Sequence, residues 1–153
     1  TEILANIINC IIISYELIGK DDIKLCIELL YDETLFNLYN VAKILNYNNI
    51  KNIKDFFCKN KDNNYRENTA IFSYYIVKTS LLYSLNDFLH YLNNNFLKNN
   101  ESTKNKFIRL VESNLKQKSY HKNVDICLNH IIGNKMLFKS LKMTLFEIKQ
   151  QFT

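Results

Sequence analysis

The scarcity of turn residues constrains this chain more than any motif does. Its 153 residues include no proline and only two glycines, Gly19 and Gly133. Tight turns between strands depend on glycine for positive φ and on proline for a preset φ, so a many-stranded sheet is disfavoured. Helices joined by short polar turns need few of either residue. With 47% hydrophobic and 23% charged residues, the chain is long enough for one hydrophobic core, and we predict an all-α fold.

Apolar residues recur at helical spacing along most of the chain. The pattern predicts about seven or eight short helices stacked as helical hairpins, with no period regular enough for a named repeat. Residues 11–18 are the exception, because this run before Gly19 could also form a short strand. Gly133 is expected to stop a helix, and a last helix or helical hairpin is expected over 137–152. The clearest amphipathic stretches are 85–96, 107–115 with Ser102 or Thr103 as its cap, and 124–132.

Acidic and hydroxyl side chains mark the expected helix starts. Asp21 or Asp22 is a candidate N-cap for the helix that follows, and Thr34 is a candidate cap for the next one. The acids Asp32 and Glu33 likewise fall at an expected helix end, where capping and the helix dipole favour carboxylates without any catalytic role. The helix after Thr34 is expected to present one apolar stripe, made of Leu35, Leu38, Tyr39, Ala42 and Leu45.

The sequence contains no arrangement that indicates catalysis or metal binding. Its three histidines, His90, His121 and His130, lie at no metal-ligand spacing from one another or from a cysteine, so we expect neither a zinc site nor another cofactor. Two isolated glycines also rule out glycine-rich phosphate loops and the nucleophile-elbow motif. We therefore expect a protein without enzymatic activity and without a metal.

The four cysteines lie far apart, beside apolar residues, as small buried thiols do. Free thiols indicate a reducing compartment and hence the cytoplasm, with a disulfide framework as the weaker interpretation. Lys59 and Lys61 could lower the pKa of the Cys58 thiol. Two phenylalanines directly precede that cysteine, however, and they favour its burial. The cysteines are Cys10, Cys26, Cys58 and Cys127.

A formal net charge of +5 and a pI near 8.9 permit attraction to acidic partners. The lysines are scattered among acidic and asparagine neighbours, without an arginine-rich helix or an aromatic ribonucleoprotein motif, which disfavours nucleic acid as a partner. The longest apolar run, Ile7–Ile18, is interrupted by polar residues and is too short to span a bilayer, so we expect no membrane partner. Neither a start methionine nor a basic leader precedes Thr1, and we expect an excised part of a longer protein.

In their order along the chain, these segments resemble the end of a BTB domain followed by the BACK domain of BTB–BACK–Kelch proteins, in particular the poxviral kelch-like ones. IINCIIISYELI at 7–18 looks like the penultimate BTB helix running into a small strand, and 21–45 looks like the two closing BTB helices. The chain departs from the family pattern where a Thr-Gly pair and a Trp are expected, and where Lys135 or Met136 replaces a Pro. The stretches that resemble successive parts of BACK are NNIKNIKDFFCKN at 48–60, residues 67–98, FIRLVESNLKQK at 107–118 and ICLNHIIGNKMLFKSL at 126–141.

The resemblance implies two parts, with residues 1–46 as the C-terminal part of a BTB-like domain and residues 47–153 as a BACK-like helical domain. It implies a non-catalytic scaffold of a cullin-RING ubiquitin ligase adaptor, which spaces the BTB domain from a Kelch propeller. The implied partners are a cullin, the protein's own Kelch domain and, through the BTB part, a second copy. The implied cullin groove lies between the last BTB helices and the first BACK helices and corresponds here to Leu35, Leu38, Tyr39, Ile50, Ile53 and Phe57.

Two other functions stay open. A self-contained helical bundle of the poxviral type that inhibits host apoptosis or signalling would bind a partner's amphipathic helix in a surface groove. It is expected to have a central helix wrapped by the others, for which the apolar stretch 71–92 is the candidate. A small enzyme would need a cleft that holds one of the three histidines beside a carboxylate.

Overall fold

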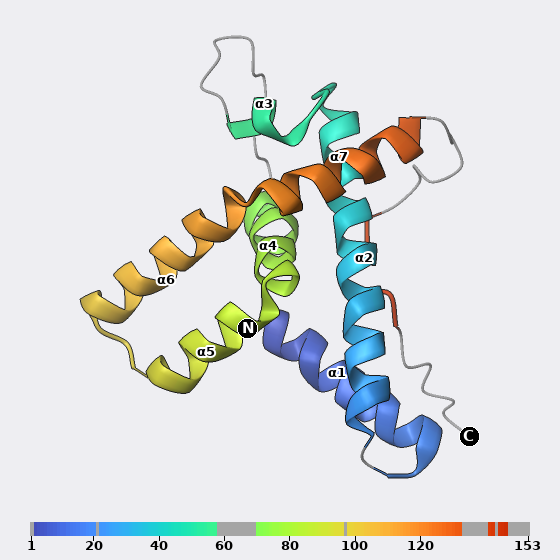
Figure 1. The fold of residues 1–153 in the computed structure, drawn as a ribbon, viewed down its shortest axis with the longest axis vertical. Helices are drawn as coiled ribbons and strands as arrows, with labels where there is room; N and C mark the ends of the chain where they lie inside the picture. The colour runs from blue at the N-terminus through green and yellow to red at the C-terminus, as the bar shows by residue number, and fades with distance from the viewer. Residues whose placement is uncertain are drawn as a thin grey trace.

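The computed structural model shows a helical assembly (Figure 1). It describes residues 2–20, 22–57, 70–96, 98–132, 141–142 and 144–146. Within these ranges there are seven α-helices, one π-helix and no strand, which confirms the predicted all-α fold. The elements are α1 (Glu2–Ile18), α2 (Ile23–Tyr47), α3 (Ile53–Phe57), the π-helix η1 (Phe72–Val77), α4 (Lys78–Tyr83), α5 (Leu85–Asn95), α6 (Glu101–Leu115) and α7 (Lys118–Ile132).

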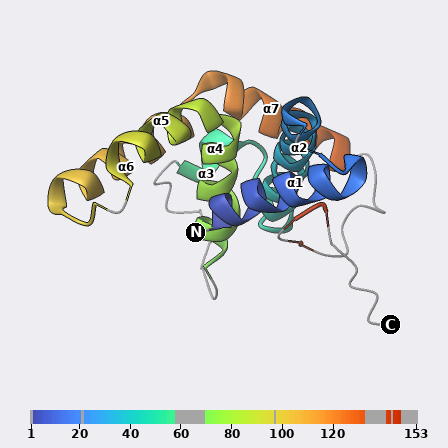
Figure 2. The same cartoon turned by 90° about the horizontal axis from the view of Figure 1, so that it is seen from below.

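The run that could have formed a strand is helical. Residues 11–18 belong to α1, so the strand alternative was wrong. The buried residues of α1 are Ile3, Asn6, Cys10 and Ser14. Their spacing of three to four residues is that of one helix face, and α1 packs against α2 and α4, as the view in Figure 2 shows. Tertiary packing therefore overrides the strand propensity of the consecutive isoleucines. Gly19 follows with a φ of 71°, which a glycine adopts without strain.

α2 is one continuous helix where two were expected. Its N-cap is Asp22, whose side chain accepts a hydrogen bond from the Leu25 backbone N–H at 3.0 Å, as predicted. The prediction that Thr34 caps a second helix was wrong, because Thr34 lies inside α2 and its hydroxyl donates to the Leu30 carbonyl at 2.8 Å. No glycine or proline interrupts this stretch, so the helix propagates through it. Glu33 is consequently not at a helix end.

The largest cluster of buried side chains lies where α2 packs along α7. Leu45 of α2, Ile53 of α3 and Tyr120 of α7 are all fully buried in it. The cluster therefore draws on both sides of the predicted domain boundary at 46/47. The division into a BTB-like and a BACK-like part stays a prediction, and in the described residues both sides share one hydrophobic core.

α4 occupies the centre of the assembly. All residues from Lys78 to Leu82 are buried, and α4 contacts α1, α2, α5 and α6. η1 leads directly into α4, and the chain leaves the helical region at Ser84, where φ is −112° and ψ is 48°. Only the first half of the stretch 71–92 forms the expected central helix. Its second half forms the separate helix α5.

The later helices match the amphipathic stretches, with differences at their ends. α6 is capped by Asn100 and not by Ser102 or Thr103. Thr103 is the other half of this capping box, since its hydroxyl accepts from the Asn100 backbone N–H. At the C-terminal end, residues 141–142 and 144–146 are not helical, so a helix through them was wrong. The expected stop at Gly133 and the rest of the expected last helix lie outside the described residues.

Candidate partner-binding groove

α2 exposes large apolar side chains and buries polar ones. Ile27, Tyr31 and Leu35 are 60%, 71% and 41% exposed, whereas Glu33 and Asn40 are 0% exposed. The three exposed residues are spaced four apart, so they form a row along one side of the helix. Single exposed apolar residues are common, but a row of them indicates an interaction surface.

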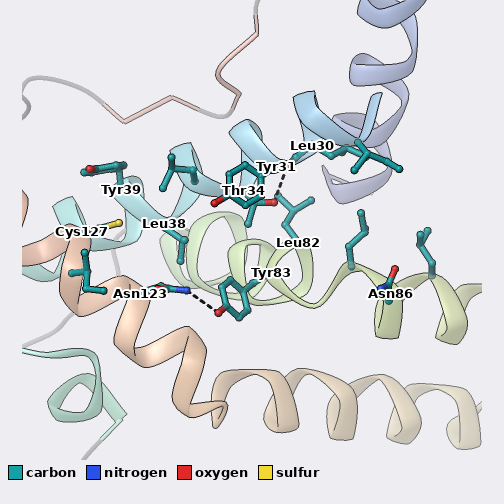
Figure 3. A pocket seen from close by; sticks show the side chains of 15 residues that line it. Leu30, Tyr31, Thr34, Leu38, Tyr39, Leu82, Tyr83, Asn86, Asn123 and Cys127 are labelled. Atoms are coloured by element: carbon teal, nitrogen blue, oxygen red, sulfur yellow. Dashed lines mark hydrogen bonds between the residues drawn. The ribbon is translucent and has the colours of Figure 1, made fainter. Parts of the chain in front are cut away.

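This row borders a groove of about 710 Å³. Figure 3 shows side chains of α2 facing those of α4, α5 and α7 across it. Twelve of its fifteen lining residues are apolar or aromatic, and the other three are Thr34, Asn86 and Asn123. The lining residues include Leu35 and Leu38 of α2, Leu82 of α4, Leu89 of α5 and Ile126 of α7. We call this feature the apolar groove.

Two polar contacts hold aromatic side chains of the apolar groove in place. The Asn123 side-chain amide donates to the Tyr83 hydroxyl at 2.8 Å, a contact drawn in Figure 3. The Tyr39 hydroxyl lies 2.7 Å from His130 Nδ1. Burial, with a smaller contribution from Cys127, raises the pKa of Tyr39, so this phenol is a neutral hydrogen-bonding group at pH 7. These contacts make the tyrosines fixed parts of the surface.

The residues predicted to bind a cullin do not form one surface. Leu35, Leu38 and Tyr39 line the apolar groove. Ile53 is fully buried in the main core and Ile50 packs against that core, so the structure does not bring them to the groove. Phe57 is 38% exposed and stacks on His121 at a ring distance of 6.1 Å. The side chains that face α2 across the groove come from helices such as α5 and α7, and none comes from α3. Apolar spacing near α3 could not indicate which helices lie opposite α2.

The three histidines have separate environments. His90 shares a shallow cleft of about 570 Å³ between α5 and α6 with Asp87 and Arg109, among others. His90 Nε2 lies 3.3 Å from the side-chain amide of Asn94, and no hydrogen bond joins His90 to Asp87 within the described part of the chain. His121 Nε2 lies 2.6 Å from the Leu115 carbonyl. In the described ranges no three His, Cys, Asp or Glu side chains are grouped so that they could hold a metal ion.

The thiols that the structure describes are free. Cys10 and Cys127 are buried, Cys26 is partly buried, and none of the three forms a disulfide, so the disulfide interpretation was wrong for them. Burial raises the pKa of Cys10 to about 12 and that of Cys127 to about 11, with the Glu33 carboxylate adding to the shift at Cys10. Such thiols are poor nucleophiles at neutral pH. Cys58, for which a lowered pKa was considered, lies outside the described residues.

Sequence patterns missed one residue of chemical interest. Glu33 looked like a capping acid, yet its side chain is fully buried between α1 and α2, where it accepts a hydrogen bond from the Asn6 side-chain amide. Lys78 of α4 is also buried and feels the Glu33 charge. Glu33 stands between Asp32 and Thr34, so no local pattern in the sequence distinguishes it from a capping or surface acid.

Comparison with protein-family models, with curated proteins and with solved structures finds no match to this chain. The BTB–BACK–Kelch resemblance therefore stays a prediction. None of the helices in the described ranges combines the length and hydropathy needed to cross a membrane.

Proposed function

We propose that this chain is a non-catalytic interaction module that binds an amphipathic helix of a partner protein in the apolar groove. The observation that carries the proposal is the continuity between the groove and the exposed row on α2. Ile27, Tyr31 and Leu35 belong to the groove lining and are also largely open to solvent. An apolar surface of this kind gains free energy when a partner covers it.

The shape of the surface fits a helix. Ile23, which is 77% exposed, extends the row on α2 by one more turn. From Ile23 to Leu35 the row is about 18 Å long at the rise of an α-helix. A partner helix with apolar residues at positions i, i+3 or i+4, and i+7 would lay them between α2 on one side and Leu89 and Ile126 on the other.

Fluorescence anisotropy with two labelled peptides tests this function. One peptide is a pro-apoptotic amphipathic helix and the other is the N-terminal segment of a cullin. They represent the two partner classes expected from the sequence, an apoptosis or signalling protein of the host and a cullin. We expect saturable binding of one of them to the wild-type chain, with affinity reduced at least about tenfold by Tyr31→Glu or Ile126→Glu, equivalent to about 1.4 kcal/mol. Both side chains are more than half exposed, so these changes should spare the fold.

The matched control is Tyr47→Glu at the end of α2, where the tyrosine is 85% exposed and lies outside the apolar groove. Binding that Tyr47→Glu weakens as much as Tyr31→Glu would place the contact elsewhere. Absence of binding by either peptide at high micromolar concentration would argue against both partner classes.

We propose as a second candidate the scaffold of a cullin-RING substrate adaptor, with the cullin and a Kelch domain as partners in the cytoplasm. The observation that favours it is a second apolar face, on α1. Ile8, Ile11 and Tyr15 are 54%, 49% and 51% exposed at helical spacing. A chain with two separate apolar surfaces suits a spacer that contacts a neighbour at each.

Co-precipitation of a cullin with the longest natural form of the protein tests the scaffold function. We expect the cullin to be recovered with the wild-type protein. The double variant Ile8→Glu/Tyr15→Glu should recover less cullin, because it disrupts the α1 face that contacts a BTB-like neighbour. Failure with every form of the protein would remove this candidate while leaving the helix-binding groove open to the peptide test.

A further inference from the structure

The C-terminal segment lies against α1 and α2 and is held through its main chain. The Asn40 side-chain amide donates to the Lys142 carbonyl at 2.8 Å, and the Asn9 side-chain amide donates to the Phe146 carbonyl at 3.0 Å. The Leu145 backbone N–H donates to Glu33 Oε2 at 2.7 Å. Figure 1 shows two short pieces of this segment beside α2. Side chains of the helices thus bind backbone groups of Lys142, Leu145 and Phe146, independently of the side chains at these three positions.

The order of these contacts is antiparallel to α2. Lys142 is bound by Asn40 and Leu145 by Glu33, so the later residue of the segment meets the earlier residue of the helix. Asn40 and Glu33 differ by seven positions and are therefore about 10 Å apart along the helix axis. The chain bends at Leu145, so the segment presents separate backbone groups to α2 and not a continuous strand.

Side-chain burial differs between the last two described residues of the segment. The Leu145 side chain is 43% exposed. The next side chain, Phe146, packs against the cluster that contains Cys10 and Leu29. The segment therefore has one anchoring position, and the other contacts are made by its backbone.

The helix surface that holds the segment includes buried polar groups. Glu33 and Asn40 are 0% exposed, and Asn6 holds the second carboxylate oxygen of Glu33. Buried polar side chains of this kind are costly unless they are hydrogen-bonded, so their presence indicates a site for a polar ligand. Asn40 Oδ1 is buried and accepts no hydrogen bond among the described residues, so the site has capacity that this segment does not use.

We infer that Asn9, Glu33 and Asn40 form a peptide-binding site that recognises backbone groups of a segment with a large apolar residue at the Phe146 position. Lys142, Leu145 and Phe146 of the same chain supply the intramolecular ligand. We call it the main-chain site. It is separate from the apolar groove, and the inference does not depend on the function proposed above.

An exchange experiment with the full chain tests the inference. Leu145→Pro removes the N–H that Glu33 binds, and Phe146→Ala removes the anchor, so the double variant should leave the main-chain site empty while the helices keep their contacts. A labelled peptide with the sequence of residues 141–146 should bind this variant saturably. It should bind the wild-type chain at least about tenfold more weakly, because the tethered segment competes at high effective concentration.

Two controls make the outcome specific. The same peptide with proline at the Leu145 position should not bind the double variant, and Asn9→Ala added to the double variant should weaken the wild-type peptide severalfold. Equal binding of the peptide to wild-type and double-variant chains, or no binding to either, would overturn the inference. Binding of the proline-containing peptide to the double variant would show that only an apolar contact holds the peptide. That result would also overturn the inference.

A second measurement covers the case in which the double variant unfolds. In the wild-type chain, hydrogen exchange of the Leu145 amide should be slow, and Asn9→Ala should speed it without altering exchange in α7. Fast exchange of the Leu145 amide in the wild-type chain would contradict a seated segment.

Discussion

Glu33 and Lys78 place two ionisable side chains in the interior. Glu33 is 0% and Lys78 2% exposed. Burial lowers the pKa of Lys78, and the Glu33 and Glu2 carboxylates partly offset that shift. The Glu33 and Glu2 carboxylates therefore favour the charged form of the buried Lys78 side chain.

Glu33→Gln should destabilise the chain by about 3 kcal/mol, since one oxygen that accepts from Asn6 or Leu145 becomes an NH2 group and the buried Lys78 loses one of its two nearby carboxylates. Glu28→Gln, on the exposed side of α2, is the control and should change stability by less than about 0.5 kcal/mol. Urea unfolding followed by circular dichroism gives both values. Adding Lys78→Met to Glu33→Gln should recover part of the loss. An equal loss in the Glu28 and Glu33 variants would mean that the buried carboxylate contributes no more to stability than an exposed one.

Alkaline pH should weaken the fold through its buried thiols. The folded-state pKa of Cys127 is raised to about 11, above the ordinary thiol value of 9.0. The unfolded chain therefore releases this proton at lower pH than the folded chain, so the stability contribution is complete below pH 9 and is lost as pH rises through 11. Between pH 8 and pH 11 the loss from this residue amounts to at most about 2 kcal/mol.

Urea unfolding of wild type and Cys127→Ala at a series of pH values checks this loss. The stability difference between the two chains should shrink as pH rises from 8 to 11. Comparison of the two chains cancels other titrating groups, including Lys78, whose lowered pKa acts in the opposite direction. A difference that stays constant with pH would show that the Cys127 thiol is not shielded from ionisation.

At the scale of the element, α2 performs three tasks with different faces. One face holds the core residues Leu38 and Leu45, and a second holds the buried polar residues Glu33 and Asn40. The third is the exposed row that includes Tyr31. A helix with apolar residues on much of its circumference is normally buried on all sides, so the exposed row identifies the face that the rest of the described chain does not cover.

Tyr31→Ala should therefore leave stability within about 0.5 kcal/mol of wild type, whereas Leu45→Ala should cost about 3 kcal/mol by opening a cavity. The contrast separates a surface row from a core stripe, which have the same spacing in the sequence. Chemical denaturation midpoints at constant m-value give the comparison. A large loss in Tyr31→Ala would show that the row is covered in solution, for example by a second copy.

At the scale of the whole molecule, α2 and α7 join the described helices into one core. The main cluster unites α2, α3, η1 and α7, and α4 connects it to α1, α5 and α6. A domain boundary at 46/47 would have to divide this cluster.

We expect the chain to unfold in one cooperative transition. Helical circular dichroism and tyrosine fluorescence should give coincident urea curves. The reason is that each of the three clusters of buried residues includes side chains of α2 or α4, which pack against one another. Two separated transitions would support independent BTB-like and BACK-like units. Leu45→Ala should shift both probes together.

Part of the binding surface was accessible from the sequence. Leu35, Leu38 and Tyr39 were chosen for their spacing, and they do line one groove. Ile50 and Ile53 were chosen on the same grounds and lie in or against the core. Spacing identifies which residues share a helix face, but it does not say which neighbour covers that face.

The helical character and the Asp22 cap were determined by the sequence itself, because turn chemistry and capping act within a few residues. Tertiary structure alone decided that residues 11–18 are helical, that Glu33 is buried and that Leu145 reaches it. The Glu33 contact with Leu145 joins residues 112 positions apart. Asn6, which donates to Glu33, and Lys78, whose pKa the Glu33 charge affects, come from two other helices. Whether a polar residue becomes a cap, a surface group or a buried anchor depends on what packs over it, and local patterns carry no information about that.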